Sequence, residues 1–84
     1  MTDPEFDIMD ELYFISSFEE LMTKLSMEES EVINELQTLI QKGWVKCIEK
    51  DTEADIESPI NFKAEFKKYN YLATKAGLLA HNSR

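Results

Sequence analysis

The residues that could do chemistry are few, and they lie far apart in the chain. The single histidine, His81, stands close to the end of the sequence, and the single cysteine, Cys47, stands in an apolar stretch. A nucleophilic thiol needs a base within hydrogen-bond reach, and acid–base catalysis needs a titratable group in a dry pocket. We expect an exposed His81 and a buried, unreactive Cys47. The sequence therefore predicts that the protein is not an enzyme.

Metal and phosphate sites are predicted to be absent. The run "DTEADIE" places carboxylates at alternate positions from 51 to 57, as a calcium-binding loop does. Such a loop also needs a glycine and a glutamate where this chain has Ile56 and Phe62. One cysteine can form neither an internal disulfide nor a zinc site, and the two glycines, Gly43 and Gly77, cannot build a phosphate-binding loop. We expect no metal and no cofactor.

Charge is distributed unevenly along the 84 residues. Residues 1–43 carry eleven acids and two lysines, a net charge of −9, whereas residues 44–84 carry six acids and seven bases, a net charge of +1. A surface that neutralises phosphates must be basic, so the first half is poorly suited to nucleic acid. The same imbalance favours a basic protein partner or head-to-tail contact with another copy, although it also serves solubility.

Hydrophobic spacing predicts one α+β domain, mostly α, that runs from residue 1 to 84. Apolar residues recur at helical intervals in three early segments, and "WVKCIEK" and "KYNYLA" have the composition of strands. We expect helices at about 4–15, 17–25, 28–42 and 75–82, strands at about 44–50 and 67–73, and an extended loop over 51–66. No apolar run is long enough to cross a bilayer, and the acidic N-terminus is unlike a secretory signal, so a cytoplasmic protein is expected.

Several residues have the types that begin and end helices. Asp3 before Pro4 is typical of a helix start, and Ser17 with Glu20 forms the pattern of a capping box. Gly43 is placed to end the third helix in a left-handed conformation, and Thr74 is expected to cap the last one.

The segment over 58–69 has two interpretations. Phe62, Phe66 and Tyr69 have helical spacing after a Ser-Pro start, while Phe62, Ala64 and Phe66 alternate as in a strand. In either case the two phenylalanines need a surface to cover them. That surface is expected to be the domain's own helices, or else a partner.

Two motifs resemble bacterial winged-helix regulators. The stretch "FEELMTKLSMEESEVINELQTLIQKGWV" is similar to their helix-turn-helix, with matching positions at Leu21, Leu25, Val32, Leu36, Leu39, Gly43 and Val45. "YLATKAG" resembles the segment that leaves their wing, so the similarity spans about 17–77. It implies a three-helix domain with a two-stranded wing and a short C-terminal helix. Ser26 replaces a turn glycine of this pattern, and Glu28 replaces the usual helix cap; Ser26 with Glu29 is an alternative cap.

In such a fold the third helix would read DNA, yet here its exposed positions are acidic. We therefore predict a regulatory or adaptor module that binds a protein partner, with contacts from Glu29, Glu31, Asn34, Glu35, Thr38, Phe62 and Phe66. The first alternative is a DNA-binding transcription regulator that uses Ser30, Gln37, Gln41, Lys63, Lys67, Lys68 and Lys75. The second is an acidic protein that mimics nucleic acid. The resemblance also implies a homodimer, formed through the first helix or the extended loop, and no membrane contact is expected.

Overall fold

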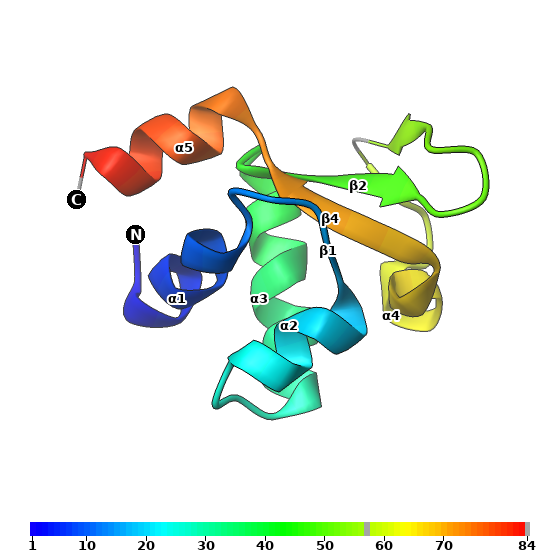
Figure 1. Ribbon diagram of the computed structural model, residues 1–84, viewed down its shortest axis with the longest axis horizontal. Coiled ribbons are helices and arrows are strands. Elements are labelled where there is room, and N and C mark those ends of the chain that lie inside the picture. Colours follow the sequence, from blue (N-terminus) through cyan, green and yellow to red (C-terminus); the bar gives the residue numbers. More distant parts are fainter. Residues whose placement is uncertain (57, 84) are drawn as a thin grey trace.

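The computed structural model describes residues 1–56 and 58–83 and shows an α+β domain in which helices pack against one antiparallel sheet (Figure 1). Within these residues, the chain forms five α-helices, one 3-10 turn and four strands. They are α1 (Asp3–Glu11), β1 (Ser16–Ser17), α2 (Phe18–Lys24), α3 (Glu29–Gln41), β2 (Val45–Glu49), β3 (Asp55–Ile56), α4 (Phe62–Glu65), η1 (Phe66–Lys68), β4 (Tyr69–Ala73) and α5 (Lys75–Asn82).

Helix α1 begins and ends at different residues from those predicted. Its cap is Thr2 and not Asp3: the Thr2 hydroxyl accepts a hydrogen bond from the Glu5 amide, and the Glu5 carboxylate accepts one from the Thr2 amide. The helix ends at Glu11, four residues before the predicted end. The Leu12 carbonyl accepts a bond from the Ala73 amide, so pairing with the sheet draws the following residues out of the helix.

The starts of α2 and α3 differ in how they are capped. Ser17 and Glu20 form the predicted capping box, with hydrogen bonds of 3.1 and 2.9 Å. Helix α3 begins after Glu28, which makes no side-chain capping bond, so the alternative cap at Ser26 is wrong. At the other end of α3, Gly43 has the expected left-handed conformation, with φ of 77°.

The sheet has four strands in the order β1-β4-β2-β3, and every neighbouring pair is antiparallel. The predicted pair corresponds to β2 and β4, which align Cys47 with Tyr71. The added strands β1 and β3 have two residues each, too few to produce a detectable alternation of polar and apolar residues. The prediction of a two-stranded wing is therefore corrected to a four-stranded sheet.

The predicted loop over 51–66 is partly ordered into β3 and α4. The open question over 58–69 resolves mainly as helix, because α4 and η1 cover 62–68. The helix does not begin at the Ser-Pro pair: its cap is Asn61, in a left-handed conformation with φ of 56°. Phe62 is only 4% exposed and contacts the Tyr71 ring, and Phe66 packs edge-on against Phe18, so the domain's own core covers Phe62.

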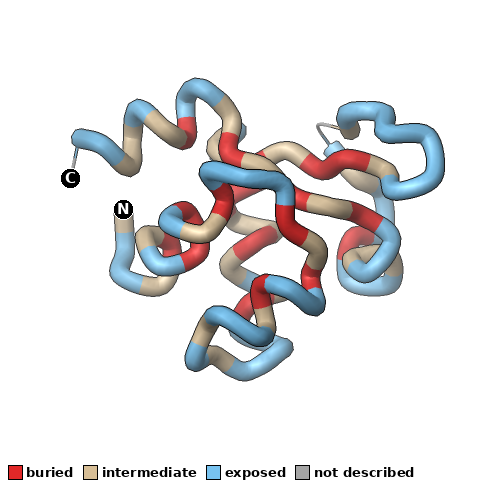
Figure 2. Tube along the Cα trace, viewed as in Figure 1, coloured by how far each residue is buried: buried red, intermediate tan, exposed pale blue. Residues whose placement is uncertain are grey.

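The hydrophobic core fills the space between the helices and one face of the sheet (Figure 2). On β4, Tyr71 and Ala73 point into the core, and the Tyr71 hydroxyl donates a hydrogen bond to the Phe66 carbonyl. Helix α5 lies close to the sheet because Gly77 has no side chain: a Cβ there would come within 2.1 Å of the Trp44 carbonyl oxygen. Thr74 caps α5 as predicted, accepting a bond from the Gly77 amide.

Candidate partner-binding surfaces

Acidic side chains gather on α1 and α3, two helices that pack against each other. We call the following residues the acidic face: Asp7, Asp10, Glu11, Glu28, Glu29, Glu31 and Glu35. All are exposed except Glu11 and Glu35, which are half-buried. Asp7, Asp10 and Glu11 border a hollow of about 290 Å³ together with residues 24–27, immediately before the Glu28 cap of α3. The second half of α1 therefore presents three carboxylates around a depression that leads to the start of α3, with Lys24 on its other side.

An ion pair between a buried carboxylate and a partly exposed lysine joins α1 to the end of α3. The Lys42 ammonium lies 2.7 Å from the Glu5 carboxylate, whose side chain is 1% exposed, and it also lies over the Trp44 ring. Burial opposes ionisation of Glu5, but hydrogen bonds from Lys42 and Thr2 outweigh it, so the pKa of Glu5 is lowered. Lys42 is the C-terminal cap of α3, and α3 itself has no lysine. The Lys42 ammonium is paired with the internal Glu5 carboxylate.

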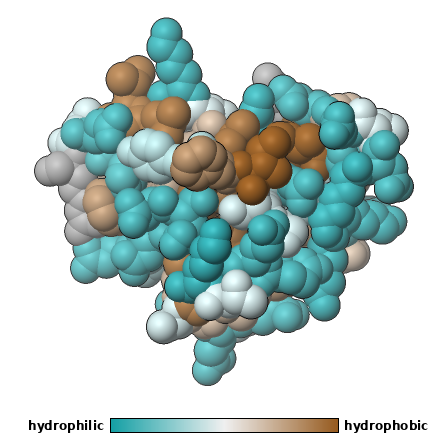
Figure 3. Space-filling model, in the orientation of Figure 1, coloured by the Kyte–Doolittle hydropathy of each residue, from teal (hydrophilic) through white to brown (hydrophobic). Residues whose placement is uncertain are grey.

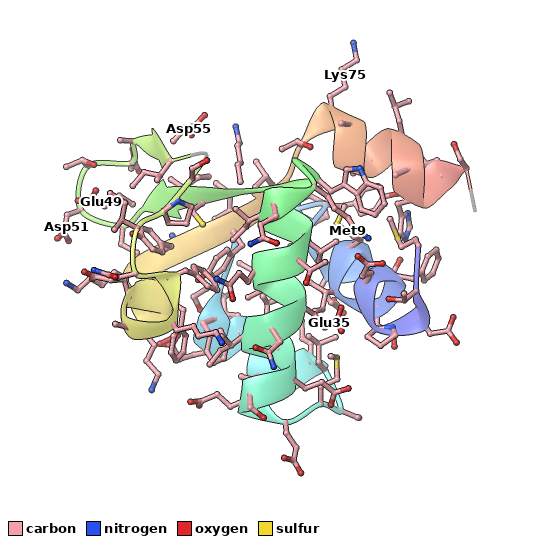
Figure 4. The ribbon with its side chains drawn as sticks, turned by 180° about the vertical axis from the view of Figure 1, so that it is seen from behind. Met9, Glu35, Glu49, Asp51, Asp55 and Lys75 are labelled. Carbon is pink, nitrogen blue, oxygen red and sulfur yellow. The ribbon has the colours of Figure 1, made fainter. Side chains whose placement is uncertain are left out.

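Glu35 lies close to two other carboxylates, Glu5 of α1 and Glu31 of α3. Its pKa is raised, first because the carboxyl is partly buried, and then because Glu5 and Glu31 lie close to it, with Lys42 acting in the opposite direction. Figure 4 shows Glu35 on the side of α3 that faces α1. The neighbouring carboxylates Glu5 and Glu31, which oppose ionisation of Glu35, would also repel a phosphate and attract a cation.

The polar candidates on α3 divide between two sides of the helix. Gln37 and Gln41 border a hollow of about 250 Å³ with Ser58, Pro59 and Phe62, on the side that faces α4. The Thr38 hydroxyl donates to the Asn34 carbonyl, which leaves it less able to donate elsewhere. Ser30 is exposed in the first turn, among the glutamates. Of the residues proposed to read bases, Ser30 thus lies within the acidic face, whereas Gln37 and Gln41 lie on the side toward α4.

The lysines of the DNA-binding alternative do not come together. Lys63, Lys67 and Lys68 are exposed on α4 and η1, whereas Lys75 begins α5 and points away from the molecule at another corner (Figure 4). The Lys68 ammonium lies 2.6 Å from the Glu65 carboxylate, which raises the pKa of Lys68. One of the three clustered lysines is therefore already paired.

The aromatic candidates differ in accessibility. Phe62 belongs to the core and offers no surface to a partner, so its selection as a contact residue is corrected. Phe66 is half-buried against Phe18 and keeps an exposed edge near Lys67.

A run of three consecutive exposed apolar residues was missed by sequence reasoning. Tyr13, Phe14 and Ile15 are 42%, 81% and 53% exposed, in the segment between α1 and β1. Their spacing continues the apolar pattern of the first helix, so the sequence predicts that the helix includes them. The helix in fact ends at Glu11, and the turn after it exposes these side chains to solvent. Figure 3 shows hydrophobic side chains gathered over β4 and this segment, with a second group over α5.

His81 is not exposed as predicted, because its side chain is only 9% accessible. The ring stacks on Phe6 with centroids 4.2 Å apart, its Nδ1 lies 2.8 Å from the Tyr13 hydroxyl, and its Nε2 lies 3.5 Å from an Asp10 oxygen. The Tyr13 hydroxyl also donates a hydrogen bond to the side-chain oxygen of Asn82. These contacts fasten the last turn of α5 to α1.

A reactive thiol and a cluster of metal-binding side chains are both missing from residues 1–56 and 58–83. Burial raises the pKa of the Cys47 thiol to about 12, which keeps it protonated and unreactive. Over residues 1–56 and 58–83, no three side chains of the metal-binding types lie together. Within those same ranges, no helix has both the length and the apolar character required to traverse a bilayer.

Comparison with known proteins adds no assignment: no family model, curated protein or solved structure matches the chain. Its function must therefore be argued from the surfaces described above.

Proposed function

We propose that the chain is a small winged-helix adaptor that binds a basic protein segment through its acidic face. The element order supports the fold assignment: three helices precede the β2–β4 pair, and β1, between α1 and α2, joins the far side of β4. In this arrangement α3 takes the place of the recognition helix and β2–β4 that of the wing.

The observation that carries the proposal is the gathering of exposed carboxylates on α1 and at the start of α3, beside a hollow that Asp7, Asp10 and Glu11 border. Three carboxylates, Glu5, Glu31 and Glu35, lie close enough to interact, and the nearby cation Lys42 is bound to Glu5. A lysine or arginine side chain from a partner would relieve the repulsion that remains. The gain would be largest at low ionic strength, because exposed charges are screened over about 10 Å at 0.1 M salt.

Contact area for such a segment is available beside the carboxylates. Leu25 and Met27 are half-buried and border the same hollow as Asp7, Asp10 and Glu11. The aliphatic stem of a lysine or arginine would lie against these side chains while its charged head meets the carboxylates. The unbranched Met27 side chain is well suited to adapt to different residues.

Two observations weigh against the DNA-binding alternative. The lysines that would contact phosphates are spread between α4–η1 and the start of α5, and one of them is paired with Glu65. The helix that would enter the groove begins with Glu28, Glu29 and Glu31. Affinity for DNA comes largely from the counterions that are released when clustered lysine and arginine side chains neutralise phosphates. This surface has few such side chains.

Affinity capture with a charge-reversal variant tests the proposal. The bait is the full chain, compared with a Glu29→Lys, Glu31→Lys variant and with a control, Asp51→Lys, Glu53→Lys, which makes the same change of charge in the β2–β3 connection. We expect a basic protein that is retained by the wild type and the control, is released by salt, and is lost with the α3 variant.

The proposal fails if the retained proteins are acidic or are held equally by all three baits. It also fails if nuclease treatment removes them, because that result would identify nucleic acid as the bridging ligand.

A further inference from the structure

The sheet has an outer face that no described helix covers. Side chains directly opposite each other in an antiparallel pair point to the same side. Tyr71 points into the core, so its neighbours Asn70 and Leu72 point outward, as do their β2 partners Ile48 and Lys46. Ile48 is 8% exposed yet lies apart from the main core cluster. The apolar residues on this side are therefore Ile48, which is already covered, and Leu72, which is half-buried.

The segment before β1 adds apolar residues to this side. Ser16 pairs with Tyr71 and Ser17 with Asn70, so continuing the register places Ile15 beside Leu72. Ile15 is 53% exposed, and the preceding Phe14 is 81% exposed. The hydrophobic patch visible in Figure 3 lies over this part of the sheet. We define the outer sheet face as Ile15, Lys46, Ile48, Asp55, Asn70 and Leu72.

Charge on the outer sheet face is balanced, unlike that on α1 and α3. Its two charged residues, Lys46 and Asp55, form an ion pair of 3.0 Å, with side chains 31% and 57% exposed. A chain with a net charge of −8 repels its own copies, except where contact keeps the acidic regions apart. In Figures 1 and 4, α3 lies on the opposite side of the molecule from the view that shows the patch, and only its last turn, at Ile40 and Gln41, borders a hollow with Lys46 and Asp55.

We propose that the outer sheet face binds a second copy of this chain about a twofold axis. The apolar centre, which is the exposed Ile15 with the half-buried Leu72, supplies the buried area, and Lys46 of each copy exchanges its internal partner for Asp55 of the other copy. A twofold axis brings the same patch of both copies together, so one cation and one anion on a patch form two reciprocal pairs. The acidic faces then remain on the outside of the dimer.

This surface differs from both dimer contacts expected from the sequence. Two copies meeting through α1 would bring Asp7 and Asp10 of each copy together. Two copies meeting through the 51–56 connection would oppose Asp51 and Glu53. Like charges placed opposite each other disfavour both arrangements.

Complementation between charge variants tests the reciprocal pairs. In Lys46→Asp alone, both pairs become anion against anion; in Asp55→Lys alone, both become cation against cation. Mixing the two variants restores two attractive pairs. By sedimentation velocity at about 100 µM and low salt, we expect the wild type and the mixture to reach twice the 9.8 kDa mass of the chain. Each variant alone should dissociate at least about tenfold more readily.

The apolar centre is tested with a matched pair of substitutions. Ile15→Asp places a charge on the outer sheet face, and Ile60→Asp makes the same change at an exposed isoleucine outside it. Because both side chains are exposed, both variants should keep the wild-type circular dichroism and melting temperature. We expect only Ile15→Asp to become monomeric. A wild type that stays monomeric up to 1 mM overturns the proposal, as does a dimer that tolerates Ile15→Asp or a mixture that fails to complement.

Discussion

The two sides of the sheet differ in how far their apolar residues are buried and in how their charges are distributed. On the helix side, Tyr71 and Cys47 are fully buried, and charge is concentrated on the outward surfaces of α1 and α3. On the outer side, Leu72 and Ile15 are partly open to solvent, and the charges of Lys46 and Asp55 cancel. Tyr71 and Leu72 are neighbours in one strand, so the difference arises from strand alternation alone.

This contrast separates residues that hold the fold from residues that are available to partners. A side chain in the core contributes to the free energy of folding of every isolated molecule. An exposed apolar side chain contributes mainly when another surface covers it. The helix side is therefore expected to determine stability and electrostatic attraction, and the outer side to determine self-association.

The largest expected difference is between adjacent residues of β4. Tyr71→Ala removes a buried ring and a hydrogen bond to the Phe66 carbonyl, and should lower the free energy of unfolding by about 3–5 kcal/mol. Leu72→Ala removes a half-exposed side chain, and should cost less than about 1.5 kcal/mol. Urea denaturation at low micromolar concentration, where the proposed dimer should be dissociated, measures both. Equal losses would contradict the assignment of the two faces.

The second-largest difference in stability is expected between the Glu5–Lys42 and Lys46–Asp55 ion pairs. Lys42→Met leaves the Glu5 carboxylate buried without its cation, at a cost of about 2 kcal/mol. Lys46→Met breaks an exposed pair on the outer side, and should change the free energy of unfolding by less than about 0.5 kcal/mol. Thermal unfolding of the monomers compares them. A larger loss for Lys46→Met would reverse the interpretation of the two sides.

Acid should reveal the contribution of Glu5. Its pKa is lowered from 4.5 in the folded protein, so its stabilising effect is present above about pH 4.5 and is lost as the pH falls through the lowered pKa. Glu5→Gln should cost about 1.5 kcal/mol at pH 7 and progressively less in acid. The free energy of unfolding, measured between pH 7 and pH 2.5, gives this difference. A gap between variant and wild type that widens in acid would contradict the pairing with Lys42.

The smallest effect is expected at Glu35, and it has the opposite sign. Because the pKa of Glu35 is raised, ionisation destabilises the folded protein as the pH rises through that pKa. Glu35→Gln should stabilise the protein at pH 7 by about 0.3 kcal/mol, since solvent screens a half-buried group. The gain should vanish near pH 3. A loss of stability at pH 7 would show that Glu35 is not repelled by its neighbours.

Features with strong local signals were predictable from the sequence. The stripe of α3 and the Ser17–Glu20 box depend on residues three or four apart, and the left-handed Gly43 depends on its own missing side chain. The α+β class follows from the same patterns.

Features that depend on distant partners were not predictable. The early end of α1 depends on pairing between Leu12 and Ala73, and β1 is too short to show a pattern. The Glu5–Lys42 pair joins residues 37 apart, and His81 is covered by Phe6 from the other end of the chain. The exposure of residues 13–15 depends on the end of α1 at Glu11, which no local pattern indicates.

The choice between a basic protein segment and nucleic acid is the central claim, and one titration tests it most directly. Fluorescence anisotropy would follow the chain binding to a labelled lysine-rich peptide and, separately, to a labelled 20-base-pair duplex, both in low salt. We predict that the peptide binds, that salt weakens this binding, that Glu29→Lys, Glu31→Lys abolishes it, and that the duplex stays free. Duplex binding that falls steeply with salt and is lost in Lys67→Glu, Lys68→Glu would contradict the account.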